Sequence, residues 1–148
     1  PPRRQRVFTD GSATVNRHGN SYGGIGVYYG RNDPRNVSEP LLNGRPTSNR
    51  AELTAILRAL ETSNRTRPLE ICTDSQSSID TIAKWHPTWT VGGWKHPTGR
   101  RIGDADIVWN ICRELASHTG PVKFTKVRAH SGNRGNDKAH RLAAKGSQ

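Results

Sequence analysis

Four short segments of this 148-residue chain place acidic residues among glycine, serine and asparagine, which are typical of turns at the ends of strands and helices. They are residues 9–12 (TDGS), 49–53 (NRAEL), 73–75 (TDS) and 129–137 (AHSGNRGND). Carboxylates drawn from separate elements repel one another, so a site made from Asp10, Glu52 and Asp74 would need cations. Mg²⁺ is the expected cation because it prefers carboxylate oxygens.

The net charge indicates a polyanionic partner. The chain carries 23 Lys and Arg against 12 Asp and Glu, a formal net charge of +11. No apolar run approaches the roughly 20 residues of a membrane span, and no basic amphipathic helix with an aromatic face is evident. We therefore expect nucleic acid and no membrane, with solubility alone as the plainer explanation of the charge. A metal-filled carboxylate cluster in such a protein indicates phosphodiester cleavage with two metal ions.

The length and the cysteines indicate one domain from a reducing environment. Cys72 and Cys112 occupy positions suited to small hydrophobic residues and lack metal-ligand or redox spacing, so we expect an intracellular location without distinguishing nucleus, mitochondrion or cytoplasm. The chain has no methionine and opens with PPRRQR, which favours a domain cut from a longer protein. We expect a basic tail or linker remnant over residues 1–5 and one domain over residues 6–148.

Hydrophobic periodicity predicts an α/β domain with a mixed sheet covered by helices. The expected strands span residues 6–10, 23–29, 37–42, 69–73 and 122–127, and the expected helices span 48–60, 75–84, 106–115 and 136–145. Residues 85–101 are rich in Pro, Gly and Trp and are expected to be irregular. Asp10 and Asp74 would then end strands, and Glu52 would lie in the first or second turn of a helix that Ser48 or Asn49 caps.

The four segments, in this order and at these separations, resemble ribonuclease H of type 1 over essentially the whole chain. Residues 24–30 (GIGVYYG) and the Trp-rich basic segment are more similar to cellular eukaryotic members than to minimal retroviral domains. The resemblance implies a ribonuclease H-like fold: a five-stranded mixed sheet whose first three strands are antiparallel, with helices on both faces. It also implies a monomer for the isolated domain.

The resemblance further implies an endonuclease that hydrolyses the RNA strand of RNA/DNA hybrids with two Mg²⁺ ions. Asp10 would bridge both ions, and Glu52 and Asp74 would complete the site. One ion would activate water while the other steadies the leaving 3′ oxygen. His130, in a glycine-rich loop, would assist proton transfer or product release.

One position departs from the family pattern. His140 stands where members usually carry a fourth catalytic and metal-binding carboxylate. Imidazole suits Mn²⁺ better than Mg²⁺, and it cannot ligate a metal when protonated. Asp137 lies three residues earlier and is explained more simply as a helix-start charge, although a role in metal binding is open.

The resemblance assigns the substrate contacts to three groups. Asn16, Ser48 and Asn49 would read the 2′-hydroxyl that distinguishes RNA from DNA. Arg45 and Thr47 would grip a DNA phosphate. The asparagine that usually completes this pocket falls near Gly103 or Asp104, and an acid there would weaken the pocket. The remaining contacts would hold the DNA strand without reading its sequence: Trp89 by stacking on sugars, and Lys95, Arg100 and Arg101 by charge. Trp85 is expected only to pack the Trp-rich segment on the neighbouring helix.

Two alternatives share this fold. The first is a module that binds hybrid or double-stranded RNA but cuts poorly, because His140 impairs one metal site. The second is the nuclease domain of a retroelement reverse transcriptase, which has the same chemistry. The three acids Asp10, Glu52 and Asp74 argue against the first alternative, and the sequence upstream of Pro1 would decide the second.

Overall fold

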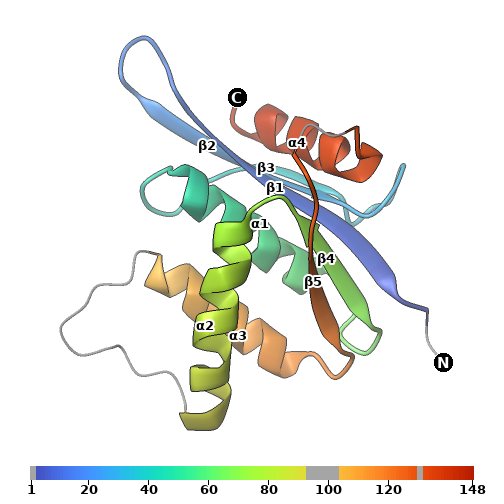
Figure 1. Ribbon diagram of the computed structural model, residues 1–148. Coiled ribbons are helices and arrows are strands. Elements are labelled where there is room, and N and C mark those ends of the chain that lie inside the picture. Colours follow the sequence, from blue (N-terminus) through green and yellow to red (C-terminus); the bar gives the residue numbers. More distant parts are fainter. Residues whose placement is uncertain (1–2, 93–103, 130–131) are drawn as a thin grey trace.

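The fold is a five-stranded sheet with helices on both faces (Figure 1), as the sequence predicted. This computed structural model describes residues 3–92, 104–129 and 132–148, with the side chains of residues 87–92 excepted. The elements are β1 (Gln5–Val15), β2 (Ser21–Tyr28), β3 (Val37–Pro40), α1 (Ser48–Thr62), β4 (Leu69–Thr73), α2 (Gln76–Gly92), α3 (Ala105–Ser117), β5 (Val122–Lys126) and α4 (Arg134–Gly146). None of the helices within these described ranges is long and apolar enough to cross a membrane.

The sheet is mixed, with the strand order β3-β2-β1-β4-β5. β1 pairs with β2 and β2 with β3 in antiparallel fashion, whereas β1 with β4 and β4 with β5 are parallel. The parallel pairs are joined through helices, the usual connection for parallel neighbours. The central strands are buried among apolar side chains of α1, and the core includes Val7, Val27, Ile71, Leu53 and Ile56.

Helix α1 is capped by Thr47, and not by Ser48 or Asn49 as the sequence analysis expected. The Thr47 side chain accepts a hydrogen bond from the backbone N–H of Arg50 at 3.1 Å. This bond satisfies one of the free N–H groups at the helix start. The side chains of Ser48 and Asn49 are therefore not used for capping.

Two element boundaries differ from the sequence prediction by more than two residues. β1 continues to Val15, because it forms a long hairpin with β2 whose register runs to Val15↔Ser21, so Asp10 lies within the strand rather than at its end. α2 continues to Gly92 instead of stopping near Lys84. Ile79, Ile82 and Trp85 extend the apolar helical spacing, and Trp85 packs on the core as expected.

Glycines in β2 let α4 lie directly on the sheet. A Cβ atom at Gly24 or Gly26 would collide with the backbone of α4, at Ala143 and Ala139 respectively. Side chains alternate between the faces of a strand, so Ile25 points to the opposite face, toward the apolar core beneath α1. Figure 1 shows α4 on one side of the sheet and α1, α2 and α3 on the other. Asp10 pairs with Gly26 and therefore shares the α4 face.

We expect Gly26→Ala to destabilise the protein by about 1–3 kcal/mol, because the added methyl group must push α4 away from β2. Urea denaturation monitored by circular dichroism would measure the change. Ser21→Ala, at an exposed position in the same strand, is the control and should change stability by less than about 0.5 kcal/mol. Equal stability of Gly26→Ala and the parent would show that α4 does not depend on this close approach.

Candidate active site

Strand register brings Asp10 and Asp74 together. The parallel pairing of β1 with β4 ends at Phe8↔Cys72, and each aspartate follows two residues later on its own strand. β1 then continues with β2 alone, whereas β4 ends at Thr73. The two carboxylates therefore occupy equivalent positions where the strands separate.

Glu52 reaches the same place from α1 because Gly11 has no side chain. A Cβ atom at Gly11 would collide with the backbone of α1 at Ala51 and Glu52. The close approach lets the Glu52 carboxylate accept a hydrogen bond from the backbone N–H of Gly11, with an N···Oε1 distance of 2.9 Å. The TDGS segment thus supplies both a carboxylate and the gap through which the glutamate enters.

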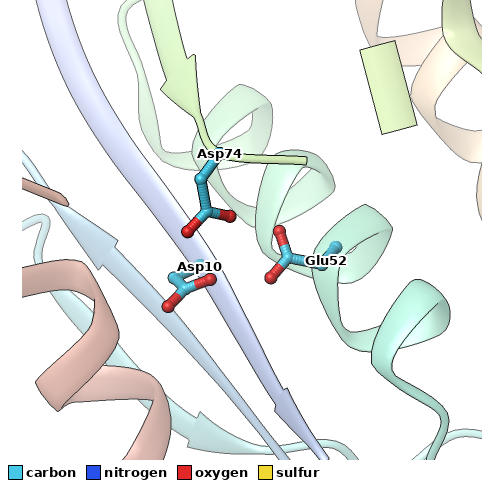
Figure 2. Close-up of side chains that lie close together, drawn as sticks. All are labelled: Asp10, Glu52 and Asp74. Carbon is cyan, nitrogen blue, oxygen red and sulfur yellow. The ribbon is translucent and has the colours of Figure 1, made fainter. Parts of the chain in front are cut away.

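The three carboxylates form one cluster (Figure 2). Asp10, Glu52 and Asp74 each offer an oxygen, and these oxygens lie within 4.8 Å of one another. Asp10 is 4% exposed and Glu52 is 8% exposed, so water screens their repulsion poorly. The structure therefore brings together the acids on which the sequence prediction depends.

The protonation of the cluster reflects this crowding. Burial, followed by the neighbouring Asp10, raises the pKa of Glu52 far above the ordinary carboxyl range. Burial and Asp10 also raise the pKa of Asp74. Glu52 Oε2 is buried with no hydrogen-bond partner among the described residues. A divalent cation would relieve the repulsion and satisfy this oxygen, and a set of carboxylate oxygens suits Mg²⁺ or Mn²⁺.

His140 stands at the edge of the cluster rather than within it. Its Nδ1 lies 2.9 Å from Asp10 Oδ2, within hydrogen-bonding distance, and its side chain is 55% exposed. The imidazole comes from α4, on the sheet face that Asp10 shares. This position places it beside one of the carboxylates that would hold metal.

Asn136 is a site residue that the sequence interpretation did not single out. It is 3% exposed, and its side chain beside Asp74 partly offsets the rise in the pKa of that carboxyl that burial and Asp10 cause. The charge of Lys126 on β5 acts in the same direction. The sequence signal was available, because Asn136 lies inside the fourth motif, next to the Gly135 that packs on the Phe8 ring.

The start of α1 carries four of the expected substrate contacts. Arg45, Thr47, Ser48 and Asn49 are exposed there, a few residues before Glu52. Asn49 donates to Asp104 Oδ2 at 3.1 Å and accepts from the Ser77 hydroxyl at 3.2 Å, so its amide is held in one orientation. Asp104 also accepts a hydrogen bond from Arg50. The carboxylate that the sequence analysis expected to repel a phosphate is therefore paired with a guanidinium.

The other expected contacts are more distant or undescribed. Asn16 lies in the hairpin turn between β1 and β2, where its Oδ1 accepts from the backbone N–H groups of His18 and Asn20. Its Nδ2 donates to the Tyr22 hydroxyl at 3.0 Å. The predictions for His130, Lys95, Arg100, Arg101 and the Trp89 side chain lie outside the described residues.

Comparison with known proteins finds similarity over nearly the whole chain. The RNase H family model matches residues 2–148. The chain is 38% identical over 144 residues to a ribonuclease H of Schizosaccharomyces pombe, covering 97% of this chain and 53% of the relative. It is 33% identical over 144 residues to human ribonuclease H1, covering 96% and 49%, and 32% identical over 142 residues to a Pseudomonas aeruginosa ribonuclease HI, covering 95% and 90%. The chain thus spans about half of the yeast and human proteins.

Solved structures share the fold. A foamy viral protease-reverse transcriptase in complex with RNA/DNA hybrid matches with a TM-score of 0.79 at 22% identity, over 97% of this chain and 20% of that one. LC9-RNase H1, described as a type 1 RNase H with the type 2 active-site motif, matches with a TM-score of 0.72 at 24% identity, over 99% and 73%. These two likenesses support the fold.

We expect Glu52→Gln to raise the melting temperature of the metal-free protein by a few degrees at mildly alkaline pH. A carboxyl whose pKa is raised by folding makes its full contribution at low pH, so parent stability should fall as pH rises above the ordinary carboxyl range of about 4.3. The glutamine amide cannot ionise, so Glu52→Gln should not lose stability in this way. Melting temperatures of both proteins, measured in EDTA across a pH series, would show the difference.

The same melts with Mg²⁺ or Mn²⁺ provide the second half of this test. Either ion should raise the melting temperature of the parent and of the control Asp80→Asn, which removes an exposed acid on α2, but not that of Glu52→Gln. An equal metal-induced rise in Glu52→Gln would contradict the assignment of Glu52 to a metal site.

Proposed function

Because this chain belongs to the ribonuclease H type 1 family, we propose that it is an endonuclease that hydrolyses the RNA strand of RNA/DNA hybrids with two divalent metal ions. The observation that carries the proposal is the convergence of Asp10, Glu52 and Asp74 from three different elements in a domain of net charge +11. A basic surface binds the backbone, and a buried carboxylate cluster provides a place for the cations. The family supports nuclease activity, whereas the choice of hybrid and the two ions are part of the proposal.

Each carboxylate has a distinct part in this proposal. Asp10 faces both Glu52 and Asp74, the position needed for a carboxylate shared by two ions. Gly11 holds Glu52 through one carboxylate oxygen and leaves the other for metal. Asn136 keeps Asp74 oriented and favours its ionised form. When bound, Mg²⁺ would make water a better nucleophile and neutralise charge that develops on the phosphate.

Recognition of the RNA strand is assigned to the start of α1 and the β1–β2 hairpin. Asn49 is held by Asp104 and Ser77, so its amide is preorganised for a hydroxyl of the minor groove. Ser48 adjoins it on the same helix, and Asn16 would contact the hybrid from the hairpin turn. Arg45 would bind a neighbouring phosphate.

A second candidate function is hybrid binding with impaired catalysis. The observation in its favour is His140 beside Asp10, where a neutral or protonated imidazole replaces the negative charge that family members usually supply. The intact cluster of three acids favours the active enzyme. An assay on labelled hybrid with Mg²⁺ and then with Mn²⁺ separates the two.

We expect Asp10→Asn to lower hydrolysis of the hybrid by at least about 100-fold, because an amide keeps the shape of the side chain but not the charge that holds cations. Hybrid binding should stay within a factor of a few of the parent. Gel assays of cleavage and fluorescence anisotropy of binding would measure both quantities, with Asp80→Asn as the charge-matched control. Cleavage by Asp10→Asn within about tenfold of the parent would show that Asp10 does not hold the catalytic metal.

His140 should shift the metal preference toward Mn²⁺, because imidazole is a poorer ligand for Mg²⁺ than a carboxylate is. We expect His140→Asp to raise activity with Mg²⁺ and to reduce the ratio of Mn²⁺ to Mg²⁺ activity. His140→Ala should lack this gain. Cleavage rates measured over a titration of each metal would compare the three proteins. Identical titrations for all three would show that position 140 takes no part in metal binding.

A further inference from the structure

Helix α4 presents a row of cations on its exposed side. Arg134, Lys138, Arg141 and Lys145 are spaced by four, three and four residues, the spacing that keeps side chains on one face of a helix. Beside the first two lies a hollow of about 470 Å³, lined by Tyr28, Arg31, Asn32, Arg134 and Lys138. We call Arg31 and the four residues of α4 the α4 basic face.

The ion pairs of the described residues do not account for these charges. Arg50, Arg58 and Arg65 each lie against a carboxylate of Asp or Glu. No ion pair within the described ranges involves any residue of the α4 basic face. Asp137 is the one acid of α4, which the structure describes in full, and it takes part in none of them. A surface of five cations is thus available to an external anion.

The arrangement also works against the helix itself. Like charges at i, i+4 repel, as Arg134 and Lys138 do and as Arg141 and Lys145 do. Arg134 is the first residue of α4, where the positive end of the helix dipole disfavours a cation. Lys145, in the last turn, is the member of the row that the dipole favours. The helix gains nothing from the cations at Arg134 and Lys138, so their placement beside the hollow points to a ligand.

This face is separate from the candidate active site. A helix turns by about 100° per residue, which puts the row roughly 130° around α4 from His140. Gly135, Ala139 and Ala143 occupy the buried side against the sheet. The row spans eleven residues of rise, about 16 Å, which equals roughly five base-pair steps of 3.4 Å. A duplex could therefore place several phosphates along it.

We propose that the α4 basic face binds the phosphate backbone of nucleic acid outside the active-site cleft, as a second contact that adds affinity without touching the scissile bond. This inference rests on the proposed function, which supplies the class of ligand. Arginine forks and lysine ammonium groups bind phosphate without reading sequence, and Tyr28 and Asn32 add hydrogen-bond donors to the hollow. The face would hold a long duplex whose end extends beyond the cleft.

The test compares two triple variants that lose the same charges. Arg31→Ala/Arg134→Ala/Lys138→Ala removes the cations around the hollow, and Arg3→Ala/Arg113→Ala/Lys123→Ala removes two arginines and a lysine exposed elsewhere. Both are made in the Asp10→Asn background, so that hybrid binding is measured without cleavage. The probes are a hybrid just long enough to fill the cleft and a hybrid several times longer.

The triple variant Arg31→Ala/Arg134→Ala/Lys138→Ala should bind the long hybrid roughly tenfold more weakly than the parent. The slope of its log affinity against log salt concentration should become shallower by about 2 to 3, because each phosphate contact contributes about one unit. Its affinity for the short hybrid should change no more than that of the control triple variant. In the background with Asp10 intact, KM for the long hybrid should rise while kcat stays unchanged. Without nucleic acid its melting temperature should equal or exceed that of the parent.

Other outcomes would overturn the inference. Equal effects of the two triple variants on the long hybrid would mean that only net charge matters. Unchanged hybrid affinity together with weakened binding of poly-glutamate would assign the face to an acidic protein partner. A lowered melting temperature with unchanged binding would assign the cations to the fold. If the protein with Asp10 intact binds long hybrid through this face but never cleaves it, the proposed function fails while this inference stands.

Discussion

The repulsion among three carboxylates is the constraint on which the structure depends. Asp10 and Glu52 are almost fully buried and Asp74 stands beside them, so the metal-free fold pays an electrostatic cost at its centre. The rest of the domain must supply enough stability to hold the cluster, and the apolar core between α1 and the sheet does so. Strain of this kind at one place, against good packing elsewhere, is typical of a functional site.

Close approach of backbones is the means by which the fold holds these acids. The start of α1 packs directly against Gly11, and α4 packs directly against Gly24 and Gly26. Gly135 packs on the Phe8 ring. Arg50 then fixes the start of α1 by donating to Asp104, Asp106 and the backbone carbonyl of Asn43. A guanidinium this deeply buried must be fully paired, and here the pairing joins α1 to α3. Glu52 is thus positioned by contacts two residues away.

The sequence predicted the elements and the three acids well, because both rest on local patterns. Short runs of β-favouring residues bounded by turn residues marked the strands, and Asp10, Glu52 and Asp74 each lay in a short motif. The end of β1 was predicted wrongly, since the hairpin with β2 extends it five residues past Asp10. That extension is a long-range pairing that no local pattern reveals. The role of Asn136 was also missed, because its contact with Asp74 joins α4 to the end of β4.

Helix α4 combines two charge patterns that only the folded structure separates. Its buried side is made of small residues that fit the glycines of β2, so the helix lies close enough for His140 to meet Asp10. This closeness fixes the rotation of the helix, and the rotation turns the basic row away from the site. In sequence, His140 and Arg141 are neighbours and look like one basic segment. In the fold, one lies at the acidic cluster and the other faces outward, so a substitution at either position should act on a different property of the protein.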